Sequence, residues 1–474
     1  MAGICAYGAY VPFYRLSRAE IAVATGGFAQ PGEKAVANFD EDSVTMAVEA
    51  GRNCLANYSE VAYPKVDGLF FATTTSPFRE KQAAVTIATA VDLPREVVTM
   101  DCTGTLRSGT LALKCAMDAV NAGTAKEVLV IASDSRLGYP QSNWEQNFGD
   151  GAAALLVGNS DVIAEIEGFY TVADEFTDLW RRQEDDFVHS WEERFILTEG
   201  FQRVMSEAIG AVLTKYNLTP KDFSKVVYSA PTERAHADIA RRLKFDPRTQ
   251  LQDPLFKKMG HSGTAAPFLQ LAAALEGAKP NDRILLASYG NGCDVYILRV
   301  TEQIKKLNKS LSVKKQLTTK KMLVNYYQYL NIRNLIPKEP TRQPSIHPPA
   351  TVTWREQESL LRFRGSRCKK CGDVQYPVQR LCSKCHSKDE YETVRLADQK
   401  ATVFLASVDT LGYGAETEPL WAIVDFPEGG RTRIQVAEAT FEDVPPGAVL
   451  EMTFRKFIRQ GDVPVYFWKG RLPR

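Results

Sequence analysis

Four cysteines in the C-terminal part of the sequence have the spacing of a metal site. They form two C-x2-C pairs separated by ten residues, and they are Cys368, Cys371, Cys382 and Cys385. Thiolates spaced in this way can close a tetrahedral zinc site, and four protein ligands leave no position open for a substrate. We therefore expect a structural zinc ion that supports a small domain by about 10 kcal/mol or more. A redox dithiol is the competing interpretation, and the neighbouring His386 is surplus to a complete ligand set.

A second stretch that could carry chemistry, DCTGTLRSGT, runs from Asp101 to Thr110. Its pattern is typical of a strand that leads into a helix, and the start of a helix is where the dipole lowers the pKa of a nucleophilic thiol. The thiol in this stretch, Cys102, lies on the strand side, four residues before Leu106. We favour a buried structural thiol for Cys102, and a relocated nucleophile is the alternative.

The elements that must position these residues alternate between apolar strands and amphipathic helices as far as about residue 300. Short runs rich in valine, isoleucine, leucine and phenylalanine are typical of buried strands. One helical pattern is capped by Asp42 or Ser43, and another closes at Gly123. Alternation of this kind predicts a layered α/β core. The predicted strands lie in residues 66–75, 126–134, 152–158, 225–231 and 282–290, and the helical patterns cover 42–58 and 109–123.

A length of 474 residues exceeds what one hydrophobic core usually supports, so we expect more than one domain. The composition of the sequence changes after residue 300. Residues 301–350 are first lysine-rich and then proline-rich around a short aromatic stretch, NYYQYL, so we expect a linker. The zinc ribbon with a preceding helix then covers 351–390. Five strand patterns separated by glycine, proline and acidic turns in 391–474 predict a small all-β barrel of the OB-fold type.

Composition and charge exclude some classes of partner. The chain has 58 lysines and arginines against 57 aspartates and glutamates, so no basic excess indicates nucleic acid. Core packing explains the aromatic residues of the C-terminal strands, such as Phe404 and Trp421, better than base stacking does. No apolar run approaches the roughly 20 residues that span a membrane, and the N-terminus lacks the basic start of a signal peptide. Because the five cysteines outside the metal site are scattered, we expect a reducing cytoplasm.

The first 300 residues resemble the thiolase superfamily, in particular its hydroxymethylglutaryl-CoA synthase and ketoacyl synthase III branch. The resemblance rests on GICAYGAYVPFYRLSRAEIA, NFDEDSVTMAVEAGRNCL, SGTLALKCAMDAVNAGTAKEVLVIASD, FGDGAAALLVG, IAEIEGFY, DLWRR, GHSGTAAPFLQLAAAL and ILLASYGNG, in the family's order. It implies a five-layered α/β thiolase fold of two pseudo-repeated halves, here residues 1–165 and 166–300. It also implies a homodimer that binds acyl-CoA and makes or breaks carbon-carbon bonds next to the thioester carbonyl.

Three catalytic positions of the resembled synthases carry other residues in this chain. The position of the nucleophilic cysteine is Leu106, that of a histidine is Ser229, and that of the general-base glutamate is near Thr75. A thiolate normally carries the acyl group in a Claisen condensation. The altered positions therefore argue against hydroxymethylglutaryl-CoA synthase activity itself.

The resemblance implies roles for other residues. His261 aligns with a catalytic asparagine and would act as a general acid or base, and Tyr289 could donate a proton or orient a carbonyl. Backbone amides at Gly290 and Gly292 would form part of an oxyanion site. For Asp101, a carboxylate near the site competes with a helix cap, and we favour the cap.

Cations and apolar side chains complete the set of expected site residues. Cations beside Trp180 and in a later loop could bind the CoA phosphates, with surface ion pairs as the alternative. They are Arg181, Arg182, Lys257 and Lys258. We expect the substrate tunnel to be lined by Leu106, Thr75 and Tyr228.

An aldol or retro-aldol reaction needs a base, a proton donor and an oxyanion hole, but no covalent nucleophile. The steroid side-chain aldolases, which this sequence resembles, lack the cysteine and pair with a zinc ribbon and OB-fold subunit that is similar to residues 351–474. The leading hypothesis is a CoA-thioester carbon-carbon lyase of aldolase type, with the loop Thr410–Pro419 expected to extend toward the cleft. The alternatives are a Claisen-type acyltransferase and a non-catalytic acyl-CoA-binding scaffold.

Overall fold

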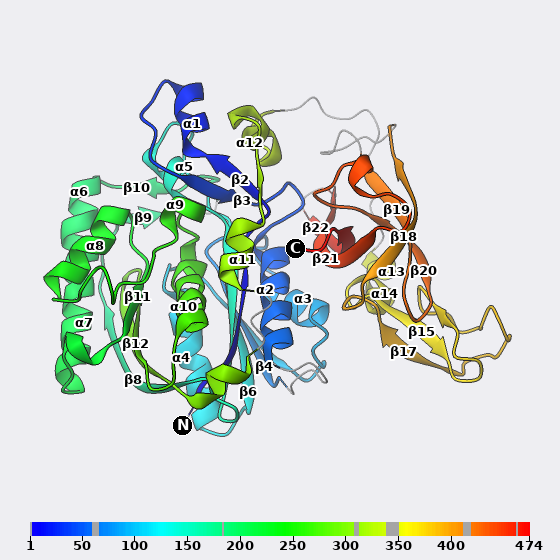
Figure 1. Ribbon diagram of the computed structural model, residues 1–474, viewed down its shortest axis with the longest axis horizontal. Helices are drawn as coiled ribbons and strands as arrows, with labels where there is room; N and C mark the ends of the chain where they lie inside the picture. The colour runs from blue at the N-terminus through cyan, green and yellow to red at the C-terminus, as the bar shows by residue number, and fades with distance from the viewer. Residues whose placement is uncertain are drawn as a thin grey trace. The chain divides into compact units, whose positions relative to one another are not determined.

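The computed structural model describes residues 2–58, 66–182, 184–307, 312–337, 350–410, 419–460 and 463–474. These residues form two compact units, which Figure 1 colours from blue to green and from yellow to red over most of their length. The first unit consists of Met1–Asn38, Asp42–Ala88 and Pro94–Arg333, and the second of Phe39–Glu41, Thr89–Leu93 and Asn334–Arg474.

A nine-stranded sheet forms the centre of the first unit. In spatial order its strands are β11 (Lys225–Tyr228), β12 (Arg283–Tyr289), β13 (Gly292–Val300), β8 (Ala164–Ala173), β1 (Gly3–Tyr10), β7 (Gly151–Gly158), β6 (Glu127–Asp134), β4 (Gly68–Ala72) and β5 (Val98–Cys102). Both halves of the sheet repeat one pattern. Each half contains a parallel pair, β4 with β6 in one half and β11 with β12 in the other, and two antiparallel pairings follow it. β1 and β8 join the halves at two positions.

Helices fill the space between the two halves and cover their outer faces. The central helices α4 (Ser108–Asn121) and α10 (Ala266–Gly277) lie between the halves of the sheet (Figure 1). α2 (Ser43–Tyr58) packs on β1, β7 and β6, whereas α7 (Arg203–Lys215) packs on β13 and β8. Separate apolar clusters form the central core and the core under α7 and α8 (Glu233–Arg242). The expected five-layered thiolase fold with two pseudo-repeated halves is confirmed.

Local signals explain where the main helices begin and end. The side chain of Asp42 accepts hydrogen bonds from the backbone amides of Val44 and Thr45, so it is the cap that starts α2. α4 ends at Asn121, and Gly123 follows at a φ of 73°, a left-handed conformation that favours glycine. Both helix ends agree with the sequence prediction.

Shorter elements surround this core. The helical ones are α1 (Arg18–Thr25), α3 (Ala83–Ala90), α5 (Asn143–Asn147), α6 (Glu193–Phe195), α9 (Phe256–Met259), α11 (Val313–Thr318), α12 (Tyr326–Ile332), a π-helical segment (Ile196–Gln202) and 3-10 turns at Pro220–Asp222, Gly263–Ala265 and Glu302–Lys306. The strands are β2 (Tyr14–Ser17), β3 (Glu33–Val36), β14 (Lys321–Met322), β9 (Leu179–Trp180) and β10 (His189–Ser190).

The structure differs from the expected linker over the first part of residues 301–350. The segment up to Arg333 belongs to the first unit, where β14 pairs with β2 and the Tyr326 hydroxyl donates to the carboxylate of Glu145 at 2.7 Å. Arg333 also pairs with Asp150 at 2.8 Å. The lysine-rich pattern misled because its lysines form the exposed face of short elements whose apolar side chains are buried. Those buried side chains are Ile304, Val313, Leu323, Tyr326 and Tyr329.

The second unit contains a ribbon and a barrel. Two short helices, α13 (Ala350–Arg355) and α14 (Gln357–Leu360), precede a three-stranded sheet of β15 (Arg364–Cys368), β16 (Val374–Gln375) and β17 (Tyr391–Arg395). The barrel strands are β18 (Ala401–Val408), β19 (Leu420–Asp425), β20 (Arg431–Gln435), β21 (Val449–Gln460) and β22 (Val463–Arg471), with a 3-10 turn at Phe441–Asp443. A bridge between Val436 and Gly470 nearly closes the barrel. All five predicted barrel strands are confirmed.

Four aromatic side chains of the barrel, Phe426, Phe454, Tyr466 and Trp468, are buried as expected, but Trp421 is half-buried and Phe404 is an exception. Trp468 and Phe454 are fully buried, whereas Phe404 is 53% exposed and lies under the guanidinium of Arg431. A bulge in β18 next to Phe404 interrupts the strict alternation of inward and outward side chains. Residues 411–418 of the loop Thr410–Pro419, expected to extend toward the cleft, lie outside the described residues.

A fully buried ionic cluster joins distant parts of the chain inside the second unit. Arg455 pairs with Glu41 and Glu438, each at 2.8 Å, and Lys469 pairs with Asp40 at 2.9 Å. Removing one partner of such a cluster leaves an uncompensated buried charge, which typically destabilises a protein by about 3–5 kcal/mol. The cluster therefore requires that residues 39–41 stay with the barrel.

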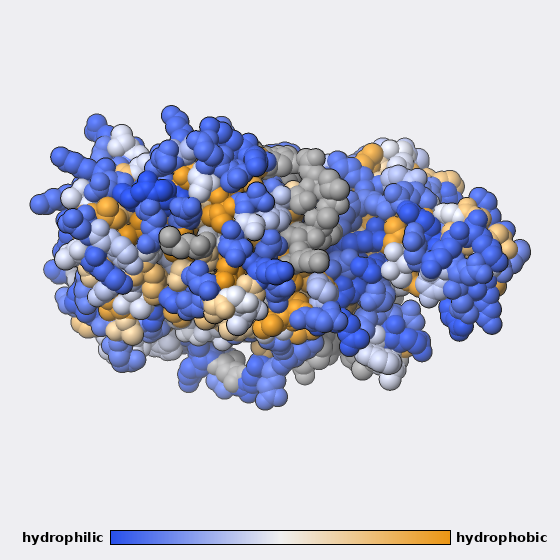
Figure 2. All heavy atoms as spheres, turned by 90° about the horizontal axis from the view of Figure 1, so that it is seen from below, coloured by the Kyte–Doolittle hydropathy of each residue, from blue (hydrophilic) through white to orange (hydrophobic). Residues whose placement is uncertain are grey.

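The face drawn in Figure 2 is mostly hydrophilic, with apolar residues in small separate patches. Within the described residues, no helix is long and apolar enough to cross a membrane.

Candidate functional site

A cavity of about 1240 Å³ lies in the first unit at the carboxyl ends of β4, β5 and β6. In α/β sheets, ligands bind outside the carboxyl ends of the strands. The walls also include the segment that precedes α4 and the turn between β12 and β13. The lining residues come from segments 73–82, 99–106, 176–188 and 290–291 and from Arg136. The volume is large enough for an extended ligand.

Leu106, one of the predicted tunnel residues, lines this cavity just before the start of α4. Cys102 lies at the end of β5 and packs against the central core, and burial raises the pKa of its thiol. Among the described residues that line the cavity there is no cysteine. The helix start in this cavity therefore presents an apolar side chain where a thiolate would be activated.

The turn between β12 and β13 braces the segment before α4. The carbonyl oxygen of Gly290 accepts hydrogen bonds from Thr105 Oγ1 and Arg107 Nε, both at 2.8 Å. Arg107 also pairs with the buried carboxylate of Asp294 at 2.9 Å. These contacts hold Leu106 in place, although its position lies far from the turn in the sequence.

The structure does not support the expected oxyanion role of this turn. The amide of Gly290 donates to the carbonyl oxygen of Gly292 at 2.9 Å, so it is not free to bind a substrate oxygen. Gly292 has a φ of 120° and pairs with Ala173 of β8, and a Cβ there would lie 2.0 Å from the carbonyl oxygen of Val172. Close strand packing therefore explains this glycine.

Two buried polar side chains that the sequence analysis missed line the same cavity. Arg136 and Asp178 both line it, and they are 6% and 8% exposed. Burial raises the pKa of Asp178, whose Oδ1 accepts from the amide of Leu179 at 2.6 Å. The hydroxyl of Tyr289 lies beside Asp178 and makes no hydrogen bond of ordinary geometry within the described part of the chain. Burial and Asp178 raise the pKa of Tyr289, so its phenol stays protonated.

A second buried carboxylate, Asp134, organises the loops around the cavity. Its Oδ1 accepts from the amide of Thr74 at 2.7 Å and from the hydroxyls of Thr73 and Thr75, each at 3.0 Å. Its Oδ2 accepts from the amide of Thr264 at 2.8 Å. Thr75 thus has a positioning contact with Asp134 and does not line the cavity.

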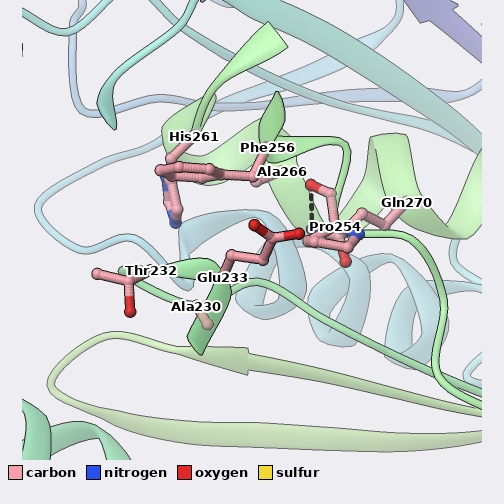
Figure 3. A pocket seen from close by; sticks show the side chains of 8 residues that line it. All are labelled: Ala230, Thr232, Glu233, Pro254, Phe256, His261, Ala266 and Gln270. Atoms are coloured by element: carbon pink, nitrogen blue, oxygen red, sulfur yellow. Dashed lines mark hydrogen bonds between the residues drawn. The ribbon is translucent and has the colours of Figure 1, made fainter. Parts of the chain in front are cut away.

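His261 faces a different and much smaller cavity (Figure 3). Its Nδ1 accepts from the amide of Gly263 at 3.1 Å, so the proton of the neutral ring is assigned to Nε2. Burial and the nearby Arg136 lower the pKa of His261 to about 3. The small cavity has a volume of about 10 Å³, roughly enough for one water molecule, and Glu233 and Gln270 also line it. At neutral pH His261 is therefore a hydrogen-bond donor and does not line the large cavity.

Three further predicted residues are buried or hydrogen-bonded within the first unit. The hydroxyl of Tyr228 donates to the carbonyl oxygen of His236 at 2.5 Å inside the core under α8, so Tyr228 does not line the large cavity. Ser229 is buried and does not line it either. Asp101 lines the cavity, and its carboxylate accepts from the first two amides of α3 at 2.7 and 2.8 Å, the favoured capping role.

The predicted phosphate-binding cations separate into two groups. Arg181 and Arg182 line the cavity, where Arg181 donates to the carbonyl oxygen of Thr74 and Arg182 pairs with Asp185. Lys257 and Lys258 lie outside it and pair with Glu233 and Asp253, at 2.9 and 2.6 Å. The first pair is thus placed to contact a ligand in the cavity, and the second pair forms surface ion pairs.

The four predicted metal ligands come together in the second unit. The Sγ atoms of Cys368, Cys371, Cys382 and Cys385 all lie within 4.8 Å of one another, and two of the pairs are 3.5 Å apart. Tetrahedral zinc with bonds of about 2.3 Å separates its sulfurs by roughly 3.8 Å, so the donor set fits this ion. His386 turns the chain at a φ of 60° and is not part of the ligand cluster.

His236 carries a pH prediction for the first unit. Burial lowers the pKa of its imidazole from 6.5 to about 4 in the folded protein. Because the unfolded chain binds the proton more readily, stability is lost as the pH falls from about 6.5 to about 4. The loss due to this side chain is about 3 kcal/mol at most.

The variant His236→Phe keeps an aromatic ring against Tyr228, whose ring centroid lies 4.6 Å away, but cannot titrate. Urea denaturation at several pH values should show that the stability of the wild type relative to this variant decreases from pH 7 to pH 4. The difference at pH 8, where the histidine is neutral in both states, serves as the baseline. Parallel pH profiles would contradict the role of His236.

Comparisons with known proteins agree with both units. Residues 100–174 and 213–299 match the family profiles described as 3-oxoacyl-[acyl-carrier-protein] synthase III and its C-terminal part. Residues 356–392 match the profile described as ChsH2, rubredoxin-like zinc ribbon domain. The four cysteines of the ribbon lie inside this match, which supports a structural zinc ion.

Two curated relatives match about 70% of this chain. A hydroxymethylglutaryl-CoA synthase of Thermococcus sibiricus is 31% identical over 335 residues, 69% of this chain and 93% of the relative. One of Caldivirga maquilingensis is 30% identical over 344 residues, 70% of this chain and 98% of the relative.

Two solved structures show the same fold. PksG, an HMG-CoA synthase from Bacillus subtilis, has a TM-score of 0.62 and 23% identity, covering 70% of this chain and 88% of that protein. An HMG-CoA synthase complexed with CoA has a TM-score of 0.59 and 20% identity, covering 70% of this chain and 90% of that protein.

Proposed function

Because this chain belongs to the hydroxymethylglutaryl-CoA synthase family of the thiolase superfamily, we propose that it makes or breaks a carbon-carbon bond next to the carbonyl of an acyl-CoA thioester. The cavity at the carboxyl ends of β4 to β6 would hold the acyl group, and Arg181 at its wall would contact a phosphate of CoA. The relative that was solved with CoA supports CoA as part of the substrate.

The observation that carries the finer proposal is the apolar side chain of Leu106 at the start of α4, in a cavity with no thiol among its described lining residues. Losing a covalent nucleophile that acts in a catalytic unit typically slows an acyl-transfer enzyme by about a million-fold. A retro-aldol cleavage has no such requirement. We therefore place the chain among carbon-carbon lyases that act on β-hydroxyacyl-CoA.

Two buried groups have the properties that this reaction needs: Asp178, which lines the cavity, and Tyr289, whose hydroxyl lies beside Asp178. The carboxylate of Asp178 would take the proton of the β-hydroxyl group, and its pKa is raised by burial toward the range of a general base. The carbon-carbon bond then breaks, a ketone or aldehyde leaves, and the thioester becomes an enolate. The phenol of Tyr289 would protonate the α-carbon and recover its proton from Asp178, which restores both groups. The positive end of the α4 dipole would stabilise the enolate oxygen.

A Claisen-type acyl transfer is the second candidate, because the curated relatives carry the name of a condensing synthase. In this chain it would need Cys102 or an external thiol as the acyl carrier. The homodimer, the cytoplasmic location and a non-catalytic acyl-CoA-binding role remain predictions of the sequence analysis.

One experiment separates the two reactions. We would incubate the purified protein with a panel of short acyl-CoAs, including β-hydroxyacyl forms, and record the intact protein mass together with the small-molecule products. We expect unmodified protein, a shortened acyl-CoA and a released carbonyl compound, because none of the described residues that line the cavity is a thiol that could hold the acyl group.

The control is the variant Cys102→Ala, which should give the same products at the wild-type rate. An acyl adduct that maps to Cys102 in the wild type and is absent from the variant would overturn the aldolase proposal and establish the acyltransferase. Saturable binding without any product would favour the scaffold instead.

A further inference from the structure

Gly200 is a glycine inside a helix at a point where the backbone does not require one. α6, the π-helical segment Ile196–Gln202 and α7 follow one another without a break, and Gly200 is buried in the π-helical part. Glycine is less favourable than alanine inside a helix, and its usual advantage is a left-handed backbone. Gly200 does not have a left-handed φ, so its presence calls for another explanation.

The neighbours of Gly200 supply that explanation. A Cβ at this position would lie 2.6 Å from the hydroxyl oxygen of Tyr289 and 2.7 Å from Cε1 of Phe176, both shorter than a van der Waals contact. Gly210 in α7 gives the contrast. Apart from the adjoining helix backbone, no atom of the described residues would lie within 4 Å of a Cβ at Gly210. The absence of a side chain at Gly200 is therefore what makes room for the end of Tyr289.

The π-helical segment encloses Tyr289 with two consecutive residues. The rings of Phe201 and Tyr289 meet edge to face with 5.5 Å between their centroids, and Tyr289 is 7% exposed. Phe201 thus holds the ring of the tyrosine, and the backbone of Gly200 limits its hydroxyl end. π-helical turns are rare and are frequent at functional sites. Here the turn fixes the position of one phenol.

The confined hydroxyl is the one that lies beside Asp178. Asp178 lines the large cavity, and so does Phe176, whose ring stacks at 5.1 Å on Phe195, just before the π-helical segment. A side chain at Gly200 would press on the ends of two side chains, which yield more easily than backbone does. The hydroxyl would therefore move relative to the Asp178 carboxylate while the fold is kept.

We propose that Gly200 is a positioning residue for the chemistry of the large cavity, and that its lack of a side chain fixes the Tyr289 hydroxyl beside the Asp178 carboxylate. This inference rests on the proposed function, in which Tyr289 protonates the α-carbon and recovers its proton from Asp178. Proton transfer needs the two groups within hydrogen-bond reach, and a misplacement of about 1 Å can slow an enzyme by about a hundred-fold.

The test measures kcat with two substrates, β-hydroxybutyryl-CoA and β-hydroxy-β-phenylpropionyl-CoA, whose cleavage would release acetaldehyde and benzaldehyde. Gly200→Ala should lower kcat by about ten- to a hundred-fold. In the Tyr289→Phe background the hydroxyl is absent, so the same substitution should change kcat by less than about two-fold. The control Gly210→Ala should keep the wild-type kcat and should not lower the midpoint of thermal unfolding.

A second background separates the two short contacts and covers a Gly200→Ala protein that does not fold. Phe176→Leu removes the Cε1 atom and leaves the contact with Tyr289. Adding Gly200→Ala to Phe176→Leu should therefore still lower kcat by about ten-fold or more. No loss in this background would show that Gly200 acts through Phe176 and would overturn the inference.

The pH profile distinguishes this role from a loosened fold. Burial raises the pKa of Asp178, and the hydroxyl of Tyr289 lowers it. The other groups that lower this pKa, the Leu179 amide and Arg136, are not among the contacts of a Cβ at Gly200. Moving the hydroxyl away therefore raises the pKa further, and the acidic limb of turnover should shift to higher pH, as in Tyr289→Phe. A fold loosened enough to admit water would lower the pKa and shift the limb to lower pH.

The remaining outcomes separate this inference from the proposed function. A wild-type kcat and pH profile in Gly200→Ala would overturn the inference and leave the proposed function intact. Equal losses of kcat with and without the Tyr289 hydroxyl would also overturn it, because Gly200 would then serve the fold. A wild type that releases neither aldehyde, nor any carbonyl compound from the wider panel of β-hydroxyacyl-CoAs, would overturn the proposed function and this inference together.

Discussion

Replacing Cys382 by serine is expected to release the metal from the four-cysteine site and to unfold the ribbon around it. The three strands β15 to β17 are short, and β17 has no buried residue, so they contribute little apolar core of their own. Binding of zinc to a structural four-thiolate site is worth about 10 kcal/mol or more, and this energy becomes folding energy. The loss should therefore exceed the effect of any single apolar truncation in the ribbon.

Zinc content by atomic absorption and hydrogen exchange of residues 364–395 provide the readouts. In the Cys382→Ser variant, or after treatment with a strong chelator, we expect zinc to be lost and the amides of this segment to exchange rapidly. The control is Cys115→Ser, an exposed thiol on α4 that is outside the metal site. A zinc-free protein with fully protected ribbon amides would contradict the structural role of the metal.

The variants Asp178→Asn and Tyr289→Phe are each expected to lower kcat for the proposed retro-aldol cleavage by about a hundred- to ten-thousand-fold. Asn cannot accept the hydroxyl proton, and Phe cannot deliver a proton to the enolate. Since the two groups act as a unit, the double variant should be little slower than the slower single variant. Both substitutions change the size of the side chain only slightly, so the ring at position 289 should stay packed against the ring of Phe201. The two ring centroids lie 5.5 Å apart in the wild type.

Two matched substitutions outside the cavity serve as controls. Tyr216→Phe removes a hydroxyl that contacts the backbone of Phe169, and Asp174→Asn removes the surface partner of Arg203. Both should keep the wild-type kcat. Wild-type turnover in Asp178→Asn would remove this carboxylate from the mechanism.

The pH profile gives an independent check of Asp178. The base must be ionised, and burial raises its pKa above that of an ordinary aspartate, about 4. Turnover should therefore fall as the pH is lowered, and the fall should begin at a higher pH than an exposed aspartate would give. A profile without this acidic limb would argue for another base.

Much of the fold was predictable because its signals are local. The apolar runs at 126–134 and 152–158 became β6 and β7, and the cap at Asp42 started α2 where expected. A run of buried apolar residues, a capping side chain and a C-x2-C pair each act within a few residues of the chain. The linker prediction failed over its first part for the opposite reason. The packing of this part depends on long-range contacts, such as those of Tyr326 with Glu145 and of Arg333 with Asp150, more than a hundred residues earlier.

The candidate site was predictable in outline and not in detail. Leu106, predicted to line the tunnel, lines the cavity, whereas Tyr228 and Lys257 do not, and Asp101 lines it as well as capping α3. Arg136 lies in the segment SDSR, and Asp178 lies in the segment TDLWRR. Because polar residues that follow a predicted strand often face a ligand site, this signal could have singled out Arg136. Nothing in the local pattern shows that this side chain is buried, since its burial depends on every element packed around it.

The sequence by itself determined the superfamily, the layered α/β core, the barrel and the thiol donors of the zinc site, because hydrophobic periodicity and ligand spacing are encoded in short stretches. The tertiary structure alone decided which polar groups face the large cavity, that the Gly290 amide is already bonded, and that His261 faces a separate space. Burial and charge compensation arise between residues such as Arg107 and Asp294, which are separated by 187 positions. Desolvation and ion pairing at such distances are properties of the folded chain, and they set the chemistry of the site.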